Sequence, residues 1–145
     1  MFMMVDQPVA DRWECSPAQV MAQAMTNLRD RAGKLPPTVV ASGVLSGWPI
    51  KVIRDRPAWA SSLLLDHASV TRLFGNHPQI LAAARTDCLV SFPIEIPGRI
   101  AAAISVDLER SSEDSLFLDP FVLEGGALLW GGLAPDDEED DQWTS

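Results

Sequence analysis

Residues Cys88–Leu108 read CLVSFPIEIPGRIAAAISVDL and contain two apolar runs, Cys88–Ile96 and Ile100–Leu108, on either side of Pro97-Gly98-Arg99. Val, Ile and Phe dominate the first run, Ile, Val and Ala dominate the second, and these compositions suit pleated packing. Pro-Gly is a turn sequence, because proline presets a negative φ and glycine accepts a positive one. We therefore predict a β-hairpin over Cys88–Leu108, at the centre of a sheet. Pro93 has no N–H to donate, so its nitrogen is expected to face a bulge or a sheet edge.

A helix start precedes this hairpin in the chain. Ser16-Pro17-Ala18-Gln19 combines a capping serine, a proline suited to the first helical position and a glutamine that completes a capping box. Apolar residues then recur at helical spacing up to Gly33, which ends the pattern. We predict an amphipathic helix over Pro17–Ala32, preceded by an irregular arm over residues 1–15.

The segments between this helix and the hairpin carry shorter patterns. Thr38–Leu45 is compatible with a short helix or a strand, Ser46-Gly47 is a turn, and Trp48–Ile53 alternates like a strand. Ala60–Phe74 has apolar residues at i, i+3 and i+4 spacing, which predicts helix in pieces. The alanine-rich Pro78–Arg85 is predicted to be a short helix.

The C-terminal part predicts one more helix and a tail. Asp119-Pro120 offers a cap and a first helical residue, and the helix is expected over Phe121–Trp130. Residues 134–145 include the acidic run DDEEDD and are expected to be a disordered tail. The resulting fold class is α+β, with one domain over residues 16–133 in which a small central antiparallel sheet is flanked by N- and C-terminal helices.

Composition narrows the classes of function. The net charge of the 145 residues is −9, but DDEEDD holds six of the acids and leaves 14 of the 20 acids against 11 bases. No basic patch appears, so nucleic acid is not an expected partner. No apolar run has transmembrane length and the start lacks a signal-peptide pattern, so we expect a cytoplasmic protein without a membrane partner. The two cysteines and two histidines show no ligand spacing, so neither a metal nor a cofactor is expected.

The order of these segments resembles the GAF domain family. In that family a segment with glycines, a proline and an aspartate precedes a strand with an internal proline, a glycine turn, a second strand and a closing helix. The resemblance covers about residues 17–132, and the matching residues are Gly47, Pro49, Asp55, Pro93 and Gly98.

Two departures point to a shortened or degenerate member. The glycine usual in the strand after the turn is replaced by Ala102 or Ala103, and Lys34–Ser42 leaves little room for the family's first hairpin. The resemblance implies a domain that regulates something else by binding a small ligand or a partner protein. It also implies that the first and last helices pack into a dimer bundle.

A ligand pocket is implied between the sheet and the variable segment 58–85. Candidate lining residues lie on that segment or on the facing strands: Trp59, His67, Phe74, His77, Arg85, Ser91 and Ser105. Such a cavity would be apolar with a few orienting polar groups. A purely structural interpretation stands beside it, in which Trp59 and Phe74 are core residues and Arg85 is a charge at a helix C-terminus.

The terminal helices are candidate interfaces, because a helix that is apolar on all sides is buried on all sides. We expect a homodimer or a hetero-complex through Val20, Met21, Met25, Leu28, Phe121, Leu128, Leu129 and Trp130. The first hypothesis is therefore a non-catalytic GAF-like regulatory domain. The alternative is a structural adaptor or subunit that uses these helices and its acidic tail. A thiol-dependent enzyme comes third, because Cys88 follows Asp87 in a buried strand, a setting that raises a thiol pKa.

Overall fold

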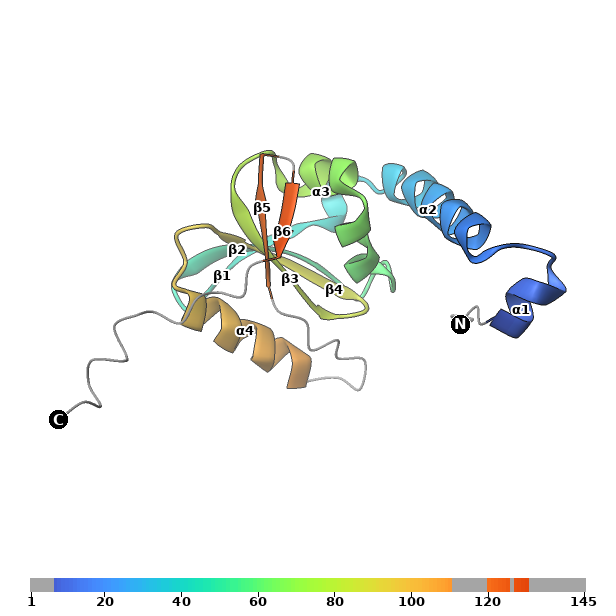
Figure 1. The fold of residues 1–145 in the computed structure, drawn as a ribbon. Helices are drawn as coiled ribbons and strands as arrows, with labels where there is room; N and C mark the ends of the chain where they lie inside the picture. Colours follow the sequence, from blue (N-terminus) through green and yellow to red (C-terminus); the bar gives the residue numbers. More distant parts are fainter. Residues whose placement is uncertain (1–6, 111–119, 126, 131–145) are drawn as a thin grey trace. The chain divides into compact units, whose positions relative to one another are not determined.

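The computed structural model describes residues 7–110, 120–125 and 127–130, and the chain divides into two units, Met1–Leu35 and Pro36–Ser145. The first unit contains helices α1 (Gln7–Arg12) and α2 (Pro17–Gly33). The second contains the sheet (Figure 1). Its elements are the 3-10 helix η1 (Pro37–Val39), strands β1 (Ala41–Leu45) and β2 (Trp48–Arg54), the 3-10 helix η2 (Ala60–Leu65), helix α3 (His67–Phe74), strands β3 (Gln79–Arg85) and β4 (Cys88–Pro93), helix α4 (Gly98–Arg110), and strands β5 (Phe121–Glu124) and β6 (Ala127–Trp130).

The predicted helix after Ser16 is confirmed as α2. Its capping box is complete, since Ser16 Oγ accepts from the Gln19 N–H at 3.2 Å and Gln19 Oε1 accepts from the Ser16 N–H at 2.8 Å. Gln7–Arg12 is also helical, although the sequence predicted an irregular arm there. Helices α1 and α2 both belong to the first unit, which ends at Leu35, and the sheet belongs to the second.

The second unit is built on one six-stranded antiparallel sheet in the order β1-β2-β4-β3-β5-β6. The predicted strand at Trp48 and the predicted turn before it are confirmed. Ser46 and Gly47 have φ values of 51° and 82°, the two positive values that a tight two-residue hairpin turn requires. Central strand β4 pairs with β2 along one edge and with β3 along the other.

Helices cover both faces of this sheet (Figure 1). On one face Ile50, Val90 and Phe92 pack with Ile104 of α4 in a continuous apolar cluster. Alternation puts Ile53, Leu81 and Leu89 on the opposite face, where η2 contacts β3 and β4 and α3 packs against η2. The helical pieces predicted over Ala60–Phe74 are therefore confirmed, and the core consists of two layers, one on each side of the sheet.

The predicted helix over Pro78–Arg85 is wrong, because these residues form β3. All seven residues of the strand, three of them alanines, are buried, and α4 and the 3-10 helix η2 both contact it. The strand pairs with β4 along one edge, with a register shift between Ala82 and Arg85, and with β5 at Gln79–Leu81 along the other. This tertiary context outweighs the intrinsic helix propensity of alanine.

The second half of the predicted hairpin is also wrong. Cys88–Pro93 is a strand as expected, but the chain then forms α4, and Ile100–Leu108 is helical. The N–H groups of Ile100 and Ala101 both bond to the Pro97 carbonyl, which begins the helix. Ile100, Ala101, Ile104 and Leu108 contact the core at the spacing of one helix face.

The predicted C-terminal helix is a hairpin in the structure. Phe121 pairs with Trp130 and Glu124 with Ala127, so the predicted helix over Phe121–Trp130 is wrong. Gly125 takes a φ of 59° at the turn, a conformation that glycine adopts at no steric cost. The tail over residues 134–145 lies outside the described residues.

The α+β class with an antiparallel sheet is thus confirmed, whereas flanking by a C-terminal helix is not. Among the residues that the structure describes, no helix is long and apolar enough to cross a membrane.

Replacing Leu89 by alanine tests the central position of β4. Leu89 is 0% exposed, so Leu89→Ala is expected to lower the free energy of unfolding by about 2–5 kcal/mol through lost burial and a cavity. Leu65→Ala is the matched control, because Leu65 is 62% exposed and its truncation should change stability by less than about 0.5 kcal/mol. Urea unfolding followed by circular dichroism measures both. Equal effects of the two substitutions would contradict the placement of β4.

Candidate functional site

A groove of about 190 Å³ opens on the sheet between the ends of β2 and β4. Three strands and one loop contribute to it. Its lining residues are Ser42 and Gly43 of β1, Pro49, Ile50 and Lys51 of β2, His77 of the loop after α3, and Ser91 and Pro93 of β4.

Two prolines explain why the groove lies there. The pairing of Lys51 with Ser91 is the last one between β2 and β4 in this direction, and continuing the register places Pro49 opposite Pro93. Neither proline has an N–H, so the ladder cannot continue past Lys51 and Ser91. The strands lose their backbone bonds at that point, and the groove begins where they end.

A row of polar side chains crosses this end of the sheet. Ser42 lies opposite Lys51, and Lys51 lies opposite Ser91, so the three side chains stand on one face of three neighbouring strands. The face is the one that η2 and α3 cover elsewhere, and the loop after α3 brings His77 to the same groove.

A buried amide holds this loop on the sheet. Gln79 is 0% exposed, and its Nε2 donates to the carbonyl oxygens of Gly75 at 2.8 Å and His77 at 3.3 Å. Gln79 Oε1 accepts from the Ser91 hydroxyl, and Lys51 Nζ donates to the Phe74 carbonyl at 3.0 Å. Together these four bonds connect the end of α3 and the loop after it with β2, β3 and β4, and both the nitrogen and the oxygen of the Gln79 amide take part.

Gly75 lets His77 take its position. Its φ is 105°, and a Cβ built on Gly75 would lie 2.7 Å from His77 Nδ1. The imidazole therefore packs against the bare glycine Cα. A larger residue would push the ring away and would also force a side chain into an unfavourable backbone conformation.

The groove is lined by groups that can donate hydrogen bonds, one of them positively charged. Lys51 carries a positive charge and retains two ammonium N–H groups beyond its bond to Phe74, while Ser42 supplies a hydroxyl and His77 an imidazole. No carboxylate is among the lining residues. Such a set suits a carboxylate or phosphate group. In the described part of the chain no three His, Cys, Asp or Glu side chains gather in a way that could hold a metal ion.

The structure brings two of the seven predicted pocket residues, His77 and Ser91, into this groove. Phe74 is a core residue, and Trp59 is half-buried in the segment before η2. His67 lies at the exposed start of α3, beside a separate shallow hollow that Thr71 and Asn76 also line. Ser105 lies on α4, across the sheet, where its hydroxyl donates to the Ala101 carbonyl at 2.9 Å.

Arg85, the remaining predicted pocket residue, forms a structural ion cluster. Its guanidinium lies 3.1 Å from Asp55 Oδ1 and 3.1 Å from Asp87 Oδ1. The Asp55 N–H also bonds to the Asp87 carbonyl at 3.0 Å. The cluster ties the end of β2 to the turn between β3 and β4, and it lies at the opposite end of β2 from the groove.

Sequence reasoning missed Ser42, Pro49 and Lys51 as site residues. The signal that could have found them is the pair Pro49 and Pro93, one in each of two predicted strands. Two prolines that cannot donate mark a place where neighbouring strands separate. The polar residues beside such a gap are candidates for a binding site.

The predicted interface residues fall into two groups. On α2, Met21 is 63% exposed and Val20, Met25 and Leu28 are half-buried. The others lie on the β5–β6 hairpin rather than on a helix: Phe121 is half-buried, Leu129 is exposed, and Leu128 and Trp130 belong to β6.

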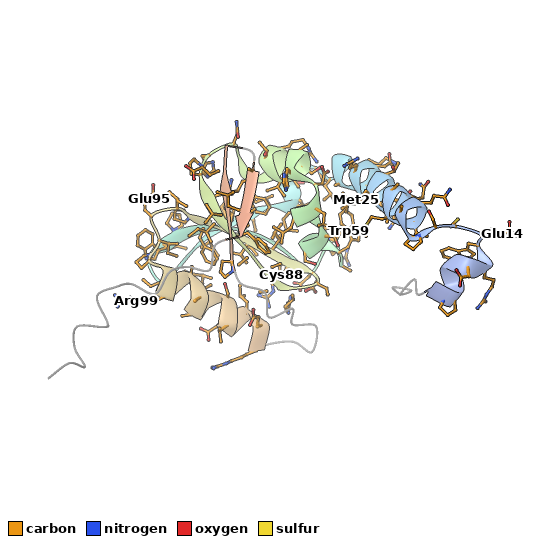
Figure 2. The ribbon with its side chains drawn as sticks, viewed as in Figure 1. Glu14, Met25, Trp59, Cys88, Glu95 and Arg99 are labelled. Atoms are coloured by element: carbon orange, nitrogen blue, oxygen red, sulfur yellow. The ribbon has the colours of Figure 1, made fainter. Side chains whose placement is uncertain are left out.

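Cys88 lies in the core cluster with Ala101 and Ile104 of α4 (Figure 2). Burial raises the pKa of its thiol above the ordinary value, against the opposing effect of the Arg85 and Arg54 guanidiniums. A raised pKa lowers the fraction of thiolate, the nucleophilic form, at neutral pH.

Gly75→Ala tests the support of His77. We expect a loss of stability of about 1–3 kcal/mol, because alanine is strained at this positive φ and its Cβ meets the imidazole. Gly33→Ala is the control, since a Cβ there has nothing within 4 Å and Gly33 lies outside the groove. Urea unfolding gives the stability, and the proton NMR signal of the His77 ring reports its displacement. An unchanged ring signal in Gly75→Ala would contradict the packing described.

Comparisons of the chain with protein families, with curated proteins and with solved structures return no match. The resemblance to the GAF family therefore stays a prediction that depends on the sequence pattern. In the structure, the segment after Gly98, where that pattern expects a strand, is α4.

Proposed function

We propose that the unit Pro36–Ser145 is a non-catalytic binding domain whose groove takes a small ligand through a carboxylate or phosphate group. The observation that carries the proposal is the convergence of Lys51, His77 and the Ser42 hydroxyl on a groove without a lining carboxylate. These groups come from β1, β2 and the loop after α3. The bonds from Lys51 to the Phe74 carbonyl and from Gln79 to the His77 carbonyl hold the end of α3 and this loop on the sheet.

The size of the groove limits the ligand. Its volume of about 190 Å³ is below the roughly 300–1,000 Å³ of pockets that enclose drug-sized molecules. A small anion, or the anionic end of a larger molecule, fits this volume. The apolar lining from Pro49, Ile50 and Pro93 favours a ligand that carries a short apolar part beside its anionic group.

A regulatory role agrees with this arrangement. Gln79 joins the groove loop to the sheet, so an anion that binds Lys51 and His77 acts on contacts that belong to the core. Ligand binding would stabilise the loop 75–78 and the ends of β2 and β4 together. We expect such a domain to pass ligand occupancy to a partner, which is the role that the resemblance to GAF domains implies.

Lys51→Gln tests the site. Titration of the labelled protein with inorganic phosphate, and separately with acetate, is expected to shift the amide NMR signals of Ser42, Lys51, His77 and Ser91. Loss of the ammonium should weaken the binding by about tenfold or more, which corresponds to about 1.4 kcal/mol. The free energy of unfolding of Lys51→Gln, measured in parallel, separates lost binding from lost folding.

The matched control for this titration is Lys34→Gln. Lys34 is exposed at the end of α2, where it pairs with Asp30 at 3.0 Å, so the same change in net charge is made outside the groove. Equal weakening by the two substitutions would show a general charge effect and would remove the site. Shifts spread over the whole surface would do the same.

The buried thiol supports a non-catalytic role. Because burial raises the pKa of Cys88, iodoacetamide at neutral pH is expected to modify the half-buried Cys15 and to leave Cys88 unmodified until denaturant unfolds the chain. Mass spectrometry of the digested protein measures each cysteine separately, and Cys15 serves as the internal control. Rapid modification of Cys88 in the native protein would instead favour a thiol-dependent enzyme.

A second candidate function rests on α2. Met21 is exposed on a well-capped helix that belongs to a separate unit, and Val20, Met25 and Leu28 remain partly accessible. An accessible apolar helix face is a feature of an adaptor that binds a larger assembly. In this alternative, the first unit binds the larger assembly and thereby attaches the sheet domain to it.

A further inference from the structure

The outer edge of β1 is an exposed sheet edge that lacks the features that usually prevent further strand pairing. Within the described part of the chain no strand pairs with that side of β1, and all five of its residues are exposed. Edge strands are commonly protected by proline, by charged residues or by a bulge. The sequence Ala41-Ser-Gly-Val-Leu45 has neither proline nor charge, and its register with β2 is continuous.

The turn fixes which backbone groups point outward. A tight turn at Ser46-Gly47 makes Leu45 and Trp48 a hydrogen-bonded pair. Alternation then makes Gly43 and Ala41 the other residues bonded to β2. The N–H and C=O groups of Ser42 and Val44 therefore face away from the sheet. Val44 lies opposite Pro49, which has no N–H to offer it, in agreement with this assignment.

We propose that two copies of this chain associate by pairing β1 with β1, antiparallel, about a two-fold axis at Gly43. This register places Ser42 opposite the partner's Val44 and Val44 opposite the partner's Ser42. The outward-facing groups of both residues are then all paired, and the two sheets become one continuous sheet. A two-fold arrangement closes as a dimer and leaves no further β1 edge.

The side chains of β1 complement themselves in this register. Each larger residue meets a smaller one, because Val44 faces the partner's Ser42 and Leu45 faces the partner's Ala41. Gly43 meets Gly43 at the axis, in a non-hydrogen-bonded pair where the backbones approach most closely. A Cβ on Gly43 would meet nothing in its own chain, so the space beside the axis is open. Val44 and Leu45, which are exposed in the single chain, become covered.

The pairing also reaches the groove. Ser42 stands in the polar row with Lys51, so a residue opposite Ser42 on the same face stands at the rim of the groove. The partner's Val44 takes that place. This surface differs from the terminal segments from which a dimer was expected, and the proposal is independent of the proposed ligand.

Light scattering and sedimentation of the full chain test the pairing. The unaltered protein is expected to show twice the mass of one chain, while Val44→Lys and Val44→Glu each show the mass of one chain, since like charges meet diagonally across the axis. An equal mixture of the two variants should recover the double mass, which rules out misfolding as the cause of dissociation. Val106→Lys and Val106→Glu, on the exposed side of α4, are the matched controls.

Disulfide formation tests the register. With Cys15 replaced by serine, Gly43→Cys places two thiols across the axis within disulfide reach and should oxidise to a linked dimer. Val44→Cys faces the partner's Ser42 and should link far more slowly. A single-chain mass for the unaltered protein overturns the proposal. So do Val44 variants that remain dimeric, or an open series of larger masses, which would indicate pairing of β1 with a different edge.

Discussion

Pairing of β4 on both of its edges is the constraint on which the rest of the sheet domain depends. Cys88–Phe92 is buried throughout, with β2 on one side and β3 on the other. A strand in this position must turn apolar groups to both faces, and α4 on one face and η2 with α3 on the other supply the cover. The same strand ends at Pro93, which cannot continue the ladder to β2 because Pro49 stands opposite. The groove is therefore a consequence of where the central pairing stops.

The groove and the core share one hydrogen-bond network. Gln79 is fully buried on β3, and its amide joins the loop at Gly75 and His77 to Ser91 of β4. Buried amides are costly when any of their bonds is missing. The loop position is consequently enforced by the cost of leaving Gln79 unpaired, and His77 is held at the groove without a bond from its own ring to that network. A ligand would meet a site that is formed before it binds.

The sequence predicted the elements whose signals are local and missed those that tertiary context decides. The capping box of α2 and the Ser46-Gly47 turn are complete within a few residues, and both were predicted correctly. Two alanine triplets show the limit. Ala82–Ala84 lies in β3 and Ala101–Ala103 in α4, the reverse of what was predicted. Alanine fits either structure, so the surroundings decide. Elements packed on both faces make Ala82–Ala84 a strand. Ile100, Ile104 and Leu108, spaced along one face, make Ala101–Ala103 part of a helix. The groove residues likewise divide into those that the sequence predicted and those that it did not. His77 and Ser91 were expected, but Ser42 and Lys51 required the register of three strands, which no local pattern contains.

The proposed groove and the proposed pairing would use different atoms of the same residues of strand β1. Its side chains at Ser42 and Val44 belong to the groove face, while the backbone groups of those residues face the open edge. A strand added at the edge would extend the wall of the groove without occupying it. Ligand binding and strand pairing would then both involve Ser42. If ligand binding changes the equilibrium constant of pairing by some factor, pairing changes the affinity for the ligand by the same factor. An anion that contacts both Lys51 and a completed rim would favour the paired state, whereas an anion held by Lys51 and His77 alone would leave the pairing unchanged. With both proposals combined, the position of the ligand within the groove would decide whether ligand binding is coupled to dimer formation.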